Sequence, residues 1–300
     1  MTNNKDNVFF FDLNGKLVKE KIEGKSFLSF IYKNPVGRFF RRILNKPFVS
    51  KINGFFQKKF FSKYKIKSFI KKHNIDTLEF EKKIDEFKSF NDFFTRKLKP
   101  GCRLIDQKNN SNIISPADSK LFVVPKISSN LKFFVKGCEF NLEKFLNDKK
   151  LAQEYEDGSI LVFRLAPYDY HRFHFPFNCL PSRPKIINGL YDSVNPLIFN
   201  KNVKPLTENE RQIITLKSNV FSNVLMVIIG AMMVGKIKLT YDPNKKQQKG
   251  DECGFFEFGA SSIALLFKKD EIKIESKFIQ NSLHGFETAV KMGQVVASKL

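Results

Sequence analysis

Three short polar clusters interrupt apolar segments in the second and third hundred residues of the chain. Ser115–Asp118 contains one carboxylate, Tyr168–His174 contains two of the four histidines, and Gly259–Ser262 places two serines behind a pair of small residues. Aspartate, histidine and serine together can make an activated nucleophile, because the acid orients the imidazole and the imidazole accepts the hydroxyl proton. The three clusters together therefore contain the residue types that a nucleophilic serine site requires.

The serine cluster lies within an apolar run, GFFEFGASSIALLF, from Gly254 to Phe267. Small residues before a serine allow its hydroxyl to approach the preceding backbone carbonyl. Buried hydroxyls cost free energy unless they are hydrogen-bonded, so serines in such a run need a reason. The alternative is a strand with a tight bend and two satisfied hydroxyls.

The two neighbouring histidines, His171 and His174, could also be a metal pair or a structural pair bonded to the backbone. No second ligand pair completes a zinc site, so no metal is expected. The four cysteines form no CxxC motif, which favours free thiols in a reducing compartment. They are Cys102, Cys138, Cys179 and Cys253, of which Cys179 reads as a small buried hydrophobe.

The elements that must position these clusters are mostly strands. A hairpin is expected over Asn7–Ile22, with its turn at Asn14-Gly15, followed by broken helices over Lys25–His73 and a mostly helical stretch over His73–Gly101. Residues 285–300 read as a helix or a loose tail. Strands are expected at 113–125, 131–135, 159–166, 185–194, 211–217, 224–239 and 253–267. This order predicts an α+β fold with a helical, basic N-terminal annex (residues 1–95) on a β-dominated catalytic body (residues 96–300).

The annex carries an unusual charge run. The chain has 52 basic and 30 acidic residues and a net charge of +22, and fourteen of the basic residues fall between Gly24 and Ile75 with no acid among them. Phenylalanines alternate with these bases, as in GFFQKKFFSKYKIKSFIKK, which is typical of a helix lying in a membrane interface. The alternatives are a helix docked on its own core and a nucleic-acid surface, but no nucleic-acid-binding motif is present. No apolar run reaches the roughly 18 residues that a spanning helix needs, and the N-terminus does not resemble a secretory signal.

Seven segments, in order along the chain, resemble phosphatidylserine decarboxylase. Such an ordered set is far more specific than a single short motif. They are FNDFFTRKLKPG from Phe90, SPAD from Ser115, LAPYDYHRFHFP from Leu165, LYDSVNP from Leu190, ENER from Glu208, VGKI from Val234 and KGDECGFFEFGASS from Lys249.

The resemblance implies a self-cleaving enzyme that depends on a pyruvoyl group. Ser261 would attack the carbonyl of Ala260, with His174 as its base and Asp118 orienting that base. The chain would separate into residues 1–260 (β chain) and 261–300 (α chain), and Ser261 would become the pyruvoyl cofactor that binds substrate as a Schiff base. His171 would assist decarboxylation. The pyruvoyl carbonyl is the electron sink that loss of CO₂ from an amino acid requires.

The resemblance also implies a phosphatidylserine substrate, an anionic membrane surface, a homodimer and a peripheral location on the cytoplasmic face of the cell membrane, without nucleic acid. Two departures flank Ser261, since Ala260 and Ser262 stand where the family usually has glycine and threonine. A third is Ser119, which replaces the usual glycine after SPAD. Ser262 is therefore a rival nucleophile. An unprocessed lipid-binding homologue without decarboxylase activity is the alternative function.

Overall fold

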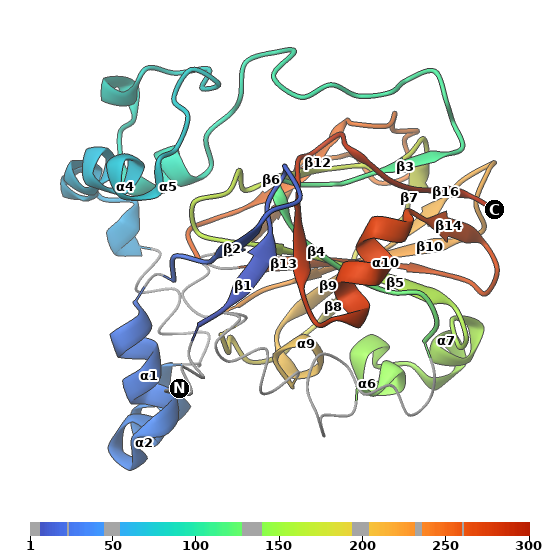
Figure 1. Cartoon of the computed structure of the whole chain (residues 1–300), viewed down its shortest axis with the longest axis horizontal. Helices are drawn as coiled ribbons and strands as arrows, with labels where there is room; N and C mark the ends of the chain where they lie inside the picture. Colours follow the sequence, from blue (N-terminus) through green and yellow to red (C-terminus); the bar gives the residue numbers. More distant parts are fainter. Residues whose placement is uncertain are drawn as a thin grey trace.

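A large mixed sheet forms the centre of the molecule (Figure 1). The computed structural model describes residues 7–22, 24–44, 55–127, 140–193, 204–231, 236–259 and 261–300. Among these residues the ten-stranded sheet has the order β2-β1-β15-β4-β5-β13-β10-β9-β7, and β8 also pairs with β9. Its strands are β1 (Phe9–Phe11), β2 (Leu17–Lys19), β4 (Ser119–Val124), β5 (Ser159–Leu165), β7 (Leu180–Pro181), β8 (Lys185–Ile187), β9 (Arg211–Lys217), β10 (Val224–Ile229), β13 (Ser261–Phe267) and β15 (Glu287–Val290).

The central strands are buried on both faces, as their nearly continuous apolar sequences require. Because side chains alternate along a strand, β5 sends Leu161 and Phe163 to one face and Ile160 and Val162 to the other. We call the face with Leu161 and Phe163 the sandwich side and the opposite face the helix side.

Two three-stranded sheets cover the sandwich side. One has the order β11-β12-β6 and the other β14-β16-β3. Phe173, Phe256 and Val296 from these sheets pack in the same cluster as Phe163 of β5. The strands are β3 (Asn112–Ile114), β6 (Arg172–His174), β11 (Ile237–Leu239), β12 (Glu252–Phe256), β14 (Ile272–Ile274) and β16 (Val295–Lys299).

Short helices cover the helix side, where Phe145, Ala152 and Leu206 pack against the sheet. These helices are α6 (Leu142–Leu146), α7 (Lys149–Glu154) and α9 (Lys204–Glu208), while α10 (Ser276–Leu283) packs on β4 and β15.

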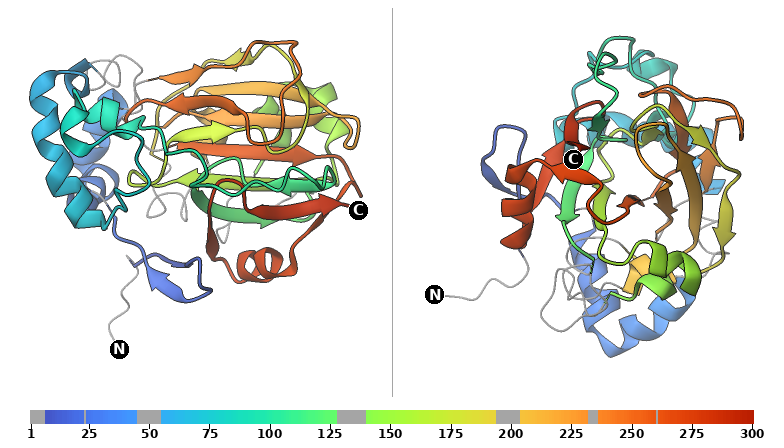
Figure 2. Two further views of the ribbon diagram at one scale, coloured as in Figure 1. Left: turned by 90° about the horizontal axis from the view of Figure 1, so that it is seen from above. Right: turned by 90° about the vertical axis from the view of Figure 1, so that its right-hand side faces the viewer.

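The annex helices gather at one end of the strands, as the left view in Figure 2 shows. They are α1 (Lys25–Lys33), α2 (Pro35–Leu44), the 3₁₀ helix η1 (Phe60–Tyr64), α4 (Lys65–His73) and α5 (Phe90–Phe94), with a 3₁₀ turn η2 (Ile84–Glu86) before α5. Among the described helices, none is long and apolar enough to cross a bilayer.

The α+β class and the β-dominated body are confirmed, as is the hairpin, which turns at Gly15 with φ of 74°. The expectation for residues 285–300 is wrong. They form β15 and β16. The first of these strands pairs with β1 and β4, and the second pairs with β14 and β3. The mostly helical reading of His73–Gly101 is also wrong: only η2 and α5 are helical there. The strand expected at 131–135 and Cys138 lie outside the described residues.

Packing of aromatic rings explains why residues 73–101 do not form longer helices. Phe80, Phe87 and Phe93 contact one another edge to face, with centroids 5.7 to 6.1 Å apart. An isolated backbone bridge joins Phe80 to Leu98. These tertiary contacts outweigh the helical propensity of the segment.

Candidate active site

Ser261 is the first residue of β13, in the middle of the large sheet. It pairs with Leu165 of β5, and its side chain shares the sandwich side with Leu165, Ile263 and Leu265. Its Oγ is buried and has no hydrogen-bond partner among the described residues. An unpaired buried hydroxyl costs about 1–3 kcal/mol, so this atom is a candidate for chemistry.

Ser262 faces the other way. It pairs with Arg164 and with Ile229 of β10, and it follows the alternation of Ala264 and Leu266 on the helix side. Its Oγ is also buried without a described partner. The two serines therefore point to opposite faces of the sheet, and of the two only Ser261 points to the side covered by β6, the strand that contains His174 and follows His171.

Both histidines are buried neutral bases whose tautomers are fixed by backbone carbonyls. Nδ1 of His171 donates to Asp169 O at 2.9 Å, and Nδ1 of His174 donates to Gly250 O at 2.8 Å. In each ring the lone pair is therefore on Nε2. Burial lowers the pKa of His171 to about 3 and lowers the pKa of His174 as well.

The two Nε2 atoms differ in their surroundings. Nε2 of His174 accepts from the Tyr170 hydroxyl at 3.3 Å. Nε2 of His171 is buried with no partner among the described residues, and its ring lies 3.8 Å from the centroid of Phe94. Among the described residues, His171 Nε2 and Ser261 Oγ are therefore both buried polar atoms without a hydrogen-bond partner.

Asp118 ends the turn between β3 and β4 and is held by cations. Nε of Arg103 donates to it at 3.0 Å and Nη2 at 2.5 Å, Lys291 Nζ lies 3.3 Å away, and the backbone N–H of Met292 donates at 2.9 Å. Burial opposes ionisation, but the hydrogen bonds from Arg103 and the charge of Lys291 hold the pKa of Asp118 below its usual range. The carboxylate is therefore charged at neutral pH.

The turn that carries Asp118 lies beside β6. The backbone N–H of His174 donates to Pro116 O at 2.8 Å. The side chains are not directly bonded: His174 bonds Gly250 and Tyr170, whereas Asp118 bonds Arg103, Lys291 and Met292. The negative charge of Asp118 nonetheless raises the pKa of His174, against the larger effect of burial.

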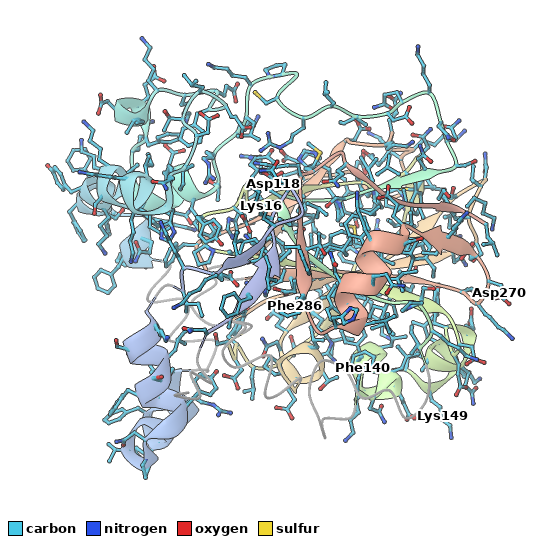
Figure 3. All side chains as sticks on the ribbon, viewed as in Figure 1. Lys16, Asp118, Phe140, Lys149, Asp270 and Phe286 are labelled. Carbon is cyan, nitrogen blue, oxygen red and sulfur yellow. The ribbon has the colours of Figure 1, made fainter. Side chains whose placement is uncertain are left out.

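A cavity of about 400 Å³ opens next to Asp118. Figure 3 labels Asp118 close to Lys16 of the β1–β2 hairpin, and the hairpin tip (Asp12–Asn14) lines the same cavity as Asp118. Tyr170 lines it too, so this cavity reaches the group that bonds His174. Its charged lining is Asp76, Glu79, Arg96, Arg103, Lys120, Asp169 and Lys291, together with Asp12 and Asp118.

Sequence reasoning did not find the cations that hold this site. Arg103 is bidentate to both Glu79 and Asp118, and Lys120 pairs with Asp169 at 2.8 Å. Arg103 lies two residues after the end of FNDFFTRKLKPG and Lys120 two residues after the end of SPAD, so nearness to those motifs was the available signal.

The remaining predicted residue, Ala260, lies outside the described residues. Gly259 before it has φ of 144°, a conformation that side chains rarely adopt. Within the described part of the chain, no three His, Cys, Asp or Glu side chains gather as a metal would require. Cys102, Cys179 and Cys253 are free thiols.

Comparisons with known proteins agree on one family. The family described as phosphatidylserine decarboxylase matches residues 90–298. A phosphatidylserine decarboxylase proenzyme of Fusobacterium nucleatum is 43% identical over 281 residues, covering 93% of each chain. One from Clostridium perfringens is 41% identical over 281 residues (93% of this chain, 95% of the relative), and one from Chlamydia felis is 38% identical over 289 residues (96% of each).

Proposed function

The chain belongs to the phosphatidylserine decarboxylase family and is an enzyme of that type, and we propose that it matures by cutting itself between Ala260 and Ser261. Its reaction would convert phosphatidylserine to phosphatidylethanolamine and CO₂. The name proenzyme, which the relatives carry, supports a precursor that is processed.

The observation that carries this proposal is the Ser261 hydroxyl. It is buried, unpaired among the described residues, and directed to the sandwich side of the sheet. Ser262 faces the helix side beside Arg164 and Ile229, so it is the weaker candidate for the nucleophile.

Self-cleavage would proceed through an ester. Ser261 Oγ attacks the Ala260 carbonyl carbon, its proton passes to Nε2 of His174, and the peptide C–N bond breaks as the Ser261 nitrogen takes up a proton. Loss of the Ser261 Cα proton then expels the Ala260 carboxylate. Water replaces the nitrogen, ammonia leaves, and the small chain begins with a pyruvoyl group.

Asp118 would support proton uptake by His174 through its charge. A nearby carboxylate favours the imidazolium that forms when the hydroxyl is deprotonated. In this role Arg103 and Lys291 hold Asp118 ionised. For His174 to accept that proton, the hydrogen bond from the Tyr170 hydroxyl to Nε2 of His174, 3.3 Å long, must first break. Rotation of the Tyr170 O–H bond is enough to break it.

The pyruvoyl group would supply the electron sink for decarboxylation. The buried, unpaired Ser261 and the neutral bases beside β6 fit such a group. His171 would hold or return a proton at the reacting carbon, because its Nε2 carries a lone pair and no described partner.

The fold would survive its own cleavage. The α chain, residues 261–300, contributes β13 to the middle of the large sheet, between β5 and β10. It also contributes β14, β15, β16 and α10. Strand pairing on both sides of β13 would keep the small chain bound to the β chain after the peptide bond is cut.

The annex, residues 1–95, would associate with the anionic membrane that holds the substrate, while residues 96–300 form the catalytic body. Several aromatic side chains of the annex are exposed: Phe27, Phe30, Phe39, Phe40, Phe55, Phe56, Phe60, Phe61 and Tyr64. Lysines lie against them, with Lys63 Nζ 3.8 Å from the Phe60 ring centroid. Apolar rings with flanking lysines suit the lipid interface, so a peripheral location on the cytoplasmic face of the membrane is proposed. A homodimer remains part of the proposal.

The test compares Ser261→Ala with Ser262→Ala. Purified protein is analysed by denaturing electrophoresis, and CO₂ release is measured on phosphatidylserine vesicles. We expect wild-type and Ser262→Ala to give a small C-terminal fragment and CO₂, and Ser261→Ala to stay intact and inactive. Cleavage of Ser261→Ala would refute the assignment. An intact wild-type chain that binds vesicles would instead identify an unprocessed lipid-binding homologue.

A further inference from the structure

Three backbone amides anchor the segment that leads to the proposed cleavage site. Phe256 N–H donates to His171 O at 3.0 Å and Glu257 N–H donates to Lys236 O at 3.0 Å. The third, Phe258 N–H, donates to Oδ1 of Asn91 at 3.0 Å. Asn91 belongs to α5, so the last anchor before Gly259 comes from the annex and not from the β body.

The Phe258 side chain is also held by α5. Its ring centroid lies 5.2 Å from that of Phe90 and 5.1 Å from that of Phe94, both edge to face. Phe258 packs on a cluster that otherwise consists of annex residues and Leu98. Phe94 in turn contacts the His171 ring at 3.8 Å. One helix therefore contacts both the pre-cleavage segment and a histidine of the site.

Helix α5 is itself firmly fixed. Ser89 caps it, accepting from Asp92 N–H at 3.2 Å, and Phe90 N–H donates to Ser62 Oγ of η1 at 2.9 Å. Arg96, just after the helix, donates to the carbonyls of Tyr168 and Asp169 at 3.1 Å each. The helix that contacts Phe258 is therefore hydrogen-bonded to the rest of the annex, and the residue that follows it is hydrogen-bonded to the segment that carries the histidines.

We propose that Asn91, with Phe90 and Phe94, positions the backbone of Phe258–Gly259 for self-cleavage. Only two residues separate the anchored Phe258 from Ser261, which is fixed by its pairing with Leu165. Attack of a hydroxyl on the adjacent carbonyl depends on their approach geometry, so an anchor on one side of the bend raises the rate. This inference rests on the proposed function and assigns a role to FNDFF, the first motif of the family resemblance.

The experiment follows precursor conversion in cell-free translation, with a pulse of labelled amino acid and a chase. The variants are Asn91→Ala, which removes the acceptor, and Asn91→Asp, which keeps an oxygen at the same place on a half-buried side chain. The matched control is Asn141→Ala, because Asn141 Oδ1 also accepts a backbone N–H, that of Lys144 at 2.7 Å, on the remote helix α6. Unfolding midpoints are measured for each variant in a Ser261→Ala background.

We expect the Asn91→Ala precursor to be cleaved about tenfold more slowly, because the hydrogen bond that positions the Phe258 backbone for the reaction is lost. Asn91→Asp and Asn141→Ala should convert near the wild-type rate. Wild-type conversion in Asn91→Ala, equal slowing in Asn91→Asp, or equal slowing in Asn141→Ala at matched stability would each overturn the inference. Conversion that persists in Ser261→Ala would refute the proposed function instead, and a wild-type chain that never converts would refute both.

Discussion

Ser261, Ser262 and His171 keep buried polar atoms without described partners. Each such atom costs about 1–3 kcal/mol, and proteins accept that cost mainly where a group must react. The sequence showed the serines and the histidines as polar breaks in apolar runs. It could not show that Asp118 is held by Lys291, which is 173 residues away, because the fold alone brings them together.

The depressed pKa of His171 makes stability depend on pH. Burial lowers this pKa to about 3, while the unfolded chain has an ordinary value near 6.5. Below about pH 6.5 His171 binds a proton in the unfolded state but stays neutral in the folded state. The free energy of unfolding therefore falls as the pH falls towards 3. In a Ser261→Ala background, the free energy of unfolding should drop between pH 6.5 and 5.5 by about 1 kcal/mol more with His171 than with His171→Phe.

Denaturant unfolding at the two pH values measures this difference. The aromatic replacement keeps a ring against Phe94, so the packing contact is preserved. Contributions of the other titrating groups are common to both proteins and cancel. Parallel pH dependences in the two proteins would mean that His171 is not a buried neutral base.

At the scale of elements, continuous apolar runs predicted the central strands well. Arg211–Lys217 was expected as a strand and is β9, and β5 differs from its expected range by one residue. The pattern did not separate Ser261 from Ser262, because both sit at the start of an apolar run that is buried on both faces. The register with Leu165 and Ile229 makes that distinction.

The errors were made where partners distant in sequence decide the structure. Residues 287–290 become a strand because β1 and β4 flank them in the sheet. Residues 73–101 are held by aromatic contacts and by bonds to the β body, such as Arg172 Nε to Thr95 O at 3.0 Å. The local amino-acid composition shows neither the strands that pair with residues 287–290 nor the contacts that hold residues 73–101.

At the scale of the whole molecule, the annex helices lie at one end of the body (Figure 2, left view). Several of their aromatic side chains are exposed. If this end contacts anionic lipid, each lysine near the surface contributes about 1 kcal/mol. Lys59 and Lys65 are both exposed. The double variant Lys59→Glu, Lys65→Glu should bind vesicles of phosphatidylserine and phosphatidylcholine at least about tenfold more weakly, with binding also weakened by salt.

Vesicle co-sedimentation measures this binding. The matched control is Lys245→Glu, Lys246→Glu, which makes the same change in net charge on exposed lysines of the β body. It should bind nearly as tightly as the wild type. Equal weakening by both pairs would show that overall charge, and not the annex surface, drives the association.

Conversion of Ser261 to a pyruvoyl group at a new chain end changes the intact masses of the purified protein, which mass spectrometry measures. We expect two chains. The large one ends at Ala260 with a free carboxylate, and the small one, residues 261–300, is lighter by one ammonia than a peptide that begins with serine. A single chain of full mass, or a small chain that begins with an unmodified serine, would contradict it.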